Sequence, residues 1–136
     1  MTGALPEYYF RVRENGAMVF RVDTENRHRR IEMDQIAVVN IKNGEIKPHG
    51  DRTLSEDDRS EIERWLESRR TTLKAREIEN ILRTVDHLNL TAAWAQQKAS
   101  PEELETVTDA LLLSMHDLRA VLVRKKADRL QDSDKD

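Results

Sequence analysis

The chain has 136 residues, of which 38% are hydrophobic and 36% are charged, and its net charge is −3. That length allows one domain with a modest core, and the lean apolar fraction favours an elongated helical body or a core completed by association. The net charge gives no global argument for binding nucleic acid or a membrane surface, and the absence of cysteine excludes disulfides and thiolate chemistry.

The N-terminus lacks the apolar run of a signal peptide, and no stretch approaches the roughly 18 apolar residues of a membrane span. We therefore expect a soluble cytoplasmic protein with no membrane partner. All four glycines lie in the first fifty residues. This distribution predicts a turn-rich β-meander over residues 1–50 and a helical region over 51–131, together forming one structural domain of the α+β class.

Apolar and polar residues alternate on both sides of Asn15-Gly16, which predicts a β-hairpin. A two-residue Asn-Gly turn would mix apolar and polar residues on each face. A three-residue loop, with Gly16 in the left-handed conformation, instead sets Phe10 opposite Phe20 and Val12 opposite Met18. We adopt this second pairing.

Extending the same pairing across the turn near Glu25-Asn26 sets Phe20 opposite Ile31 and gives a sheet with one apolar face. The other face carries basic side chains and an aromatic ring. Such a surface could bind phosphates and stack a base, although a solvated face of paired charges explains the same pattern. The candidate nucleic-acid-binding residues are Tyr9, Arg11, Arg13, Arg21 and Arg30.

Residues 34–48 allow two interpretations. Asn43-Gly44 between apolar runs predicts a second hairpin with a two-residue turn and Ile41 facing Ile46. Alternatively, Asp34 caps a short helix that ends at Val39. We favour the hairpin, which makes a meander of three to five strands.

Three helices are expected, at about 55–70, 72–97 and 101–129. Ser55 caps the first, with Asp58 at the third helical position, and Ile62, Trp65 and Leu66 form an apolar stripe that would cover the sheet. The segment 69–72 combines basic residues with weak N-cap residues, so a break is predicted there, with one continuous helix as the alternative.

The last helix opens with Ser100-Pro101-Glu102-Glu103, a capping box with proline at the first helical position. Because the linker before it is short, it should pack antiparallel on the preceding helix as a helical hairpin. The tail 132–136 has no apolar residue and is expected to be disordered.

The apolar arc of the last helix is wider than one neighbour can cover. Three consecutive leucines span roughly 200° of the helix circumference, which points to a second partner. Trp94 lies off the main stripe of the preceding helix and would also anchor a partner. The candidate contact residues for a homodimer or another protein are Trp94, Leu111, Leu112, Leu113 and Met115.

Two further groups have ordinary structural explanations. The basic residues between Arg119 and Arg129 would complement the C-terminal dipole of the last helix. Asp86-His87 and His116-Asp117 suggest a metal site between helices, but helical geometry separates them by about five residues along the axis. We therefore expect no metal.

No phosphate-binding glycine loop, nucleophile elbow or zinc-protease motif is present, so no catalytic residue and no cofactor are assigned. The sequence favours a non-enzymatic interaction or regulatory module, homodimeric through its C-terminal helices, with an unknown protein partner. The alternative is a nucleic-acid-binding protein that uses the arginine face, and a metal-binding helical protein is a remote third.

Overall fold

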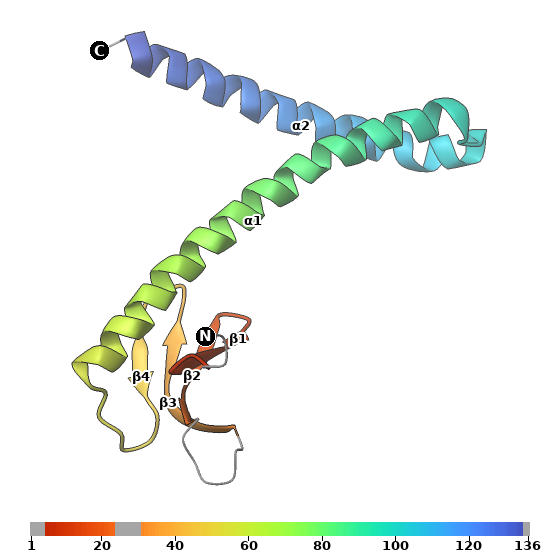
Figure 1. Ribbon diagram of the computed structural model, residues 1–136. Coiled ribbons are helices and arrows are strands. Elements are labelled where there is room, and N and C mark those ends of the chain that lie inside the picture. Colours follow the sequence, from red (N-terminus) through yellow and green to blue (C-terminus); the bar gives the residue numbers. More distant parts are fainter. Residues whose placement is uncertain (1–4, 24–30, 135–136) are drawn as a thin grey trace. The chain divides into compact units, whose positions relative to one another are not determined.

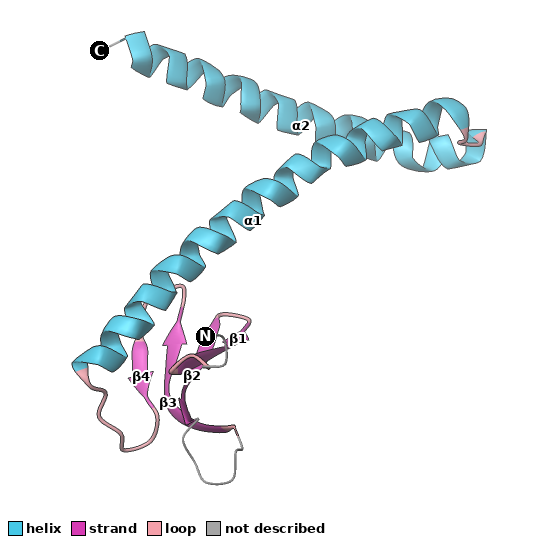
Figure 2. Cartoon of the chain, viewed as in Figure 1, coloured by secondary structure: helices cyan, strands magenta, loops and turns pink. Residues whose placement is uncertain are grey.

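The computed structural model describes residues 5–23 and 31–134. There, a four-stranded antiparallel sheet in the order β1-β2-β3-β4 precedes two long helices (Figure 1), so the predicted α+β class is confirmed. The strands are β1 (Tyr8–Arg13), β2 (Gly16–Asp23), β3 (Glu32–Asn40) and β4 (Ile46–Pro48), and the helices are α1 (Glu56–Gln97) and α2 (Pro101–Asp134) (Figure 2). The chain divides into two compact units, residues 1–80 and 81–136.

The core of the first unit lies between one face of the sheet and the N-terminal part of α1. Ile62 and Val19 are fully buried there, and Leu66 is nearly so. The rings of Phe10 and Trp65 stack with their centroids 4.7 Å apart and their planes within 2° of parallel. The predicted stripe of α1 therefore covers the sheet as expected, because these apolar side chains leave water together.

The predicted register of the first hairpin is wrong. β1 and β2 are joined by Glu14-Asn15, and Phe10 pairs with Val19 rather than with Phe20. Gly16 does not have the left-handed conformation, since only Gly44 and Gly50 have positive φ among the described glycines. Its role is steric: a Cβ at Gly16 would lie 1.9 Å from the carbonyl oxygen of Val39 in β3.

This change of register moves every β2 side chain to the face opposite the predicted one. Ala17 and Val19 point toward α1, whereas Phe20 lies on the outer face and is still only 7% exposed. Two β1 side chains shield its ring: Tyr9, at 6.2 Å between centroids, and Arg11, whose guanidinium carbon lies 4.5 Å from the ring centroid. The expectation of a single apolar face failed because the aromatic ring is covered by neighbours on its own face.

The second and third strand pairings also differ from the expected ones. Phe20 pairs with Gln35 across an irregularity between Val19 and Phe20, and the predicted partner Ile31 lies outside β3. Residues 34–40 are strand, as favoured over the short helix, but β4 joins through a five-residue loop, 41–45, and Ile46 pairs with Val39 instead of Ile41. Asn40 stabilises that loop, because its side-chain oxygen accepts hydrogen bonds from the backbone N–H groups of residues 42 and 43.

Helix α1 begins with the predicted cap. The Ser55 hydroxyl accepts a hydrogen bond from the N–H of Asp58 at 3.0 Å, and the Asp58 carboxylate accepts one from the N–H of Ser55 at 3.1 Å. The predicted break at 69–72 is absent, and α1 runs for 42 residues. No glycine or proline interrupts this segment, and the hydroxyl of Thr71 bonds to the carbonyl of Glu67 within the helix.

Helix α2 also begins as predicted. Ser100 and Glu103 exchange reciprocal hydrogen bonds of 2.9 and 3.1 Å, and Pro101 occupies the first helical position. The helix is longer than expected, because it extends through Asp134 rather than ending near Arg129. Residues 132–134 of the expected disordered tail are therefore helical.

Candidate protein-interaction surface

The second unit is a helical hairpin that is closed only near its tip. The short linker 98–100 turns the chain, and the carbonyl of Trp94 accepts hydrogen bonds from the N–H groups of Lys98 and Ala99. In the described part of this unit, the half-buried residues of the two helices lie near this turn. They are Leu88, Thr91, Trp94 and Ala95 of α1 and Leu104, Val107 and Leu111 of α2.

An apolar groove runs along the closed part of the hairpin. Its volume is about 230 Å³. Both helices contribute to its walls, and the only polar side chains among its lining residues are two threonines, Thr91 and Thr108, together with the indole N–H of Trp94. Trp94, Leu111, Leu112 and Met115 line this groove, so the structure brings together four of the five predicted contact residues.

Away from the tip, apolar side chains continue along both helices but are exposed. Over its whole described length α2 has no buried residue. The fifth predicted contact residue, Leu113, is 69% exposed and lies outside the groove lining. The other exposed large apolar residues of this unit are Ile81, Leu82, Val85, Leu90, Leu112, Met115, Leu118, Val121, Leu122, Val123 and Leu130.

Charge is divided unevenly along α2. Between residues 101 and 118 the helix carries Glu102, Glu103, Glu105, Asp109 and Asp117 and has no lysine or arginine. Between residues 119 and 131 it carries Arg119, Arg124, Lys125, Lys126 and Arg129 against a single acidic residue, Asp128. The helix dipole does not explain the basic half, because its effect is confined to the last turn and that turn has no basic residue.

The structure does not bring the predicted arginine face together. Tyr9, Arg11 and Arg13 share the outer face of the sheet, where Arg13 donates a 3.3 Å hydrogen bond to the sulfur of Met18. Arg21 lies on the α1 side, with its guanidinium 3.8 Å from Asp58 and 5.5 Å from the ring centroid of Tyr8. Arg30 lies outside the described residues.

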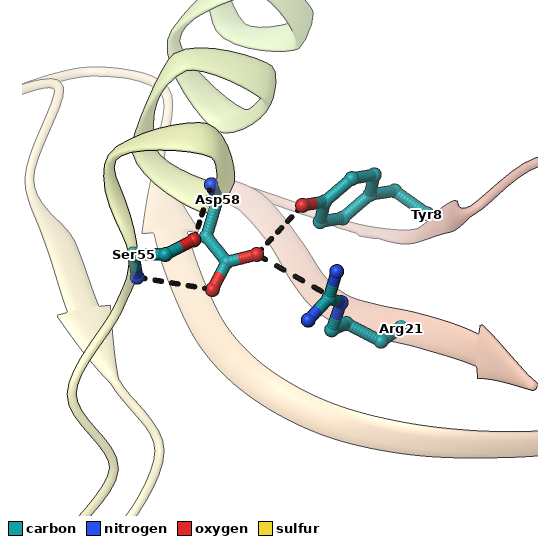
Figure 3. Close-up of polar contacts among 4 residues, drawn as sticks. All are labelled: Tyr8, Arg21, Ser55 and Asp58. Carbon is teal, nitrogen blue, oxygen red and sulfur yellow. Dashed lines mark hydrogen bonds and ion pairs between the residues drawn. The ribbon is translucent and has the colours of Figure 1, made fainter.

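Sequence reasoning missed the polar cluster at the start of α1. The Tyr8 hydroxyl donates a 2.6 Å hydrogen bond to Oδ1 of Asp58, which also faces Arg21 and Ser55 (Figure 3). Among the residues that the structure describes, Asp58 is the charged residue that is buried, at 6% exposure. Ser55 and Asp58 were identifiable from the capping pattern. The partners from β1 and β2 were not, because only the tertiary fold brings them near.

The contacts within this cluster shift the pKa values of Tyr8 and Asp58 in directions that favour the hydrogen bond between them. Burial raises the pKa of Tyr8, and the hydrogen bond to Asp58 raises it further, to about 12. Burial by itself would raise the pKa of Asp58, but hydrogen bonds from Tyr8 and Ser55 and the charge of Arg21 outweigh it and hold that pKa below its ordinary value. A protonated phenol facing an ionised carboxylate is the arrangement of a structural clamp between sheet and helix.

Comparison with known proteins gives no match among protein-family models, curated proteins or solved structures. Among residues 5–23 and 31–134, no helix is both long and apolar enough to cross a membrane. Within the same residues, no group of three or more His, Cys, Asp and Glu side chains is placed to hold a metal ion.

Proposed function

We propose that this protein is a non-enzymatic interaction module that self-associates through the apolar surface of its helical hairpin. The observation that carries the proposal is the exposure of α2, which is 34 residues long, has no buried residue and bears large apolar side chains along its length. Contiguous exposed apolar surface of this kind is typical of an interface, because water contact with it is unfavourable.

The position of the exposed residues supports association by helix packing. Leu104, Val107 and Leu111 form a half-buried stripe that lines the groove together with α1 near the tip, and the same stripe continues through Met115, Leu118 and Leu122. At about 100° per residue, these six positions lie within roughly 60° of one line along α2. The stripe therefore has a partner at one end and an exposed continuation at the other, as in a helix that packs on a second chain.

Nucleic-acid binding through the sheet has less support. The outer face retains Tyr9, Arg11 and Arg13, but Tyr9 and Arg11 pack on Phe20 and Arg13 bonds to Met18. An aromatic ring and a guanidinium that pack on a neighbouring ring are less free to stack on a base or to bind a phosphate.

The test is sedimentation velocity of the full chain and of the Leu118→Asn/Leu122→Asn variant at matched micromolar concentrations. Removing two apolar side chains from the exposed stripe leaves the charge unchanged, and we expect the dissociation constant of the dimer to rise at least about tenfold.

The matched control is Ala120→Asn/Ala127→Asn. Both alanines are exposed on the opposite side of α2, and the replacement lowers helix propensity by a similar amount. This variant should dimerise like the unmodified protein. Equal loss of association in the two variants would mean that helix stability, rather than the stripe, governs assembly, and an unmodified chain that stays monomeric would refute the proposal.

A further inference from the structure

The two halves of helix α2 carry opposite charge. Its first half, residues 101–118, is acidic and borders the apolar groove, whose α1 wall over residues 88–95 has no charged side chain. Its second half, residues 119–131, is basic and carries exposed apolar residues, among them Leu122, Val123 and Leu130. One half thus resembles a receptor with an acidic rim, and the other a ligand with an apolar side and basic flanks.

The two halves cannot meet within one chain. They belong to the same uninterrupted helix, which has no glycine or proline after Pro101 and rises about 1.5 Å per residue. Residues 105 and 126 are therefore about 30 Å apart along the axis. Complementarity of this kind is satisfied only by a second molecule.

We propose that two copies of this chain pair their α2 helices antiparallel, crossing near Met115, so that the basic half of each copy lies along the acidic hairpin tip of the other. This inference rests on the proposed self-association and specifies its geometry. A twofold axis near Met115 places Glu105 of one copy close to Lys126 of the other, and it repeats the same contact on the other side of the axis. Each groove then receives the apolar side of the opposite basic half.

The opposite orientation is disfavoured by charge. A parallel pair would set the acidic half against the acidic half and the basic half against the basic half, so each contact would repel. An exposed ion pair contributes little to affinity, so charge selects the orientation while apolar burial provides most of the affinity. Because the antiparallel arrangement uses both halves of both helices, it closes on itself and stops at a dimer.

The chain has no cysteine, which allows a direct test of orientation. Glu105→Cys and Lys126→Cys are prepared as separate full-length variants, both at exposed positions. Each is treated with a short bismaleimide alone and after refolding as an equimolar mixture, and the covalent dimers are analysed by mass spectrometry. We expect a 105-to-126 linkage in the mixture at several times the yield of either variant alone. Met115→Cys, near the proposed crossing, should link to itself.

Each other result has a defined meaning. Efficient linkage of Glu105→Cys to itself and of Lys126→Cys to itself would show a parallel pair, which overturns the antiparallel arrangement and leaves self-association standing. A dimer by sedimentation in which none of the three variants links would place the interface elsewhere and also overturn this inference. A chain that sediments as a monomer would overturn both the arrangement and the proposed function.

Discussion

The hydroxyl of Tyr8 lies 2.6 Å from Oδ1 of Asp58, a residue fifty positions later in the chain. Tyr8 belongs to β1 and Asp58 to the first turn of α1, so this bond connects the edge strand of the sheet to the helix that covers it. Asp58 also completes the cap of α1 with Ser55. One buried carboxylate therefore stabilises both the start of the helix and its attachment to the sheet.

Replacing Tyr8 with phenylalanine should destabilise the first unit. The substitution removes one donor from an ionised carboxylate that is only 6% exposed as a residue, and the loss for such a bond is about 1.5–3 kcal/mol. Chemical denaturation monitored by tryptophan fluorescence measures it. Tyr9→Phe is the matched control, because Tyr9 lies on the opposite face of β1, is 43% exposed and should lose less than about 0.5 kcal/mol.

The same bond predicts a dependence of stability on alkaline pH. The folded-state pKa of Tyr8 is raised to about 12, above the ordinary tyrosine value of about 10. The stabilisation linked to the protonated phenol is therefore fully present below about pH 10 and is lost as the pH rises toward 12. In the Tyr9→Phe variant, ultraviolet titration of the remaining tyrosine should give a midpoint near 12, and an ordinary midpoint in the folded protein would contradict the clamp.

Gly16 and Gly50 should respond differently to alanine. A Cβ at Gly16 would meet the Val39 carbonyl oxygen at 1.9 Å, so β2 and β3 must separate and the loss of stability should exceed about 2 kcal/mol. Gly50 has open space around it and a φ of +59°. Alanine there should lower the stability by only about 1 kcal/mol, because a residue with a Cβ is disfavoured in the left-handed conformation. Comparable denaturation midpoints for the two variants would argue against the close strand approach.

Local signals in the sequence predicted the elements well. Both helix caps, at Ser55 and Ser100, were identified correctly, because each capping hydroxyl and the backbone N–H that it binds are three residues apart in the sequence. The α1 stripe containing Ile62 and Leu66 was also correct, since helical periodicity defines it without reference to other elements.

The strand registers could not be obtained in the same way. The alternation of side chains along a strand indicates which residues share a face of the sheet. The predicted registers also assumed that all large apolar side chains lie on the same face. Phe20 violates this assumption because Arg11 and Tyr9 cover it on the outer face. The observed two-residue turn, Glu14-Asn15, replaces the predicted three-residue loop and places Gly16 in β2, where β3 approaches it closely. No local pattern in the sequence records that approach.

The candidate interaction surface was predictable in part. The wide apolar arc at Leu111 and Leu112 was predicted from their adjacent positions in the helix. In the structure these two residues line a groove with Trp94. The division of α2 into acidic and basic halves was also present in the sequence, but the basic half was assigned to the helix dipole. That assignment required the helix to end near Arg129, whereas it extends to Asp134.

The proposed dimer should weaken as salt is added. The Debye length falls from about 10 Å at 0.1 M to about 3 Å at 1 M, so attraction between the acidic and basic halves of α2 is screened. We expect the dissociation constant to rise about three- to tenfold over this range, with apolar burial maintaining the dimer. A parallel pair would instead tighten, because salt would relieve its repulsion, and sedimentation at the two salt concentrations separates the two cases.

The most direct measurement is the mass of the unmodified full-length chain by sedimentation equilibrium over a range of micromolar concentrations. The exposed stripe and the divided charge of α2 predict a species with twice the chain mass of 15.9 kDa that dissociates on dilution. A mass of 15.9 kDa at every concentration would contradict self-association through this helix.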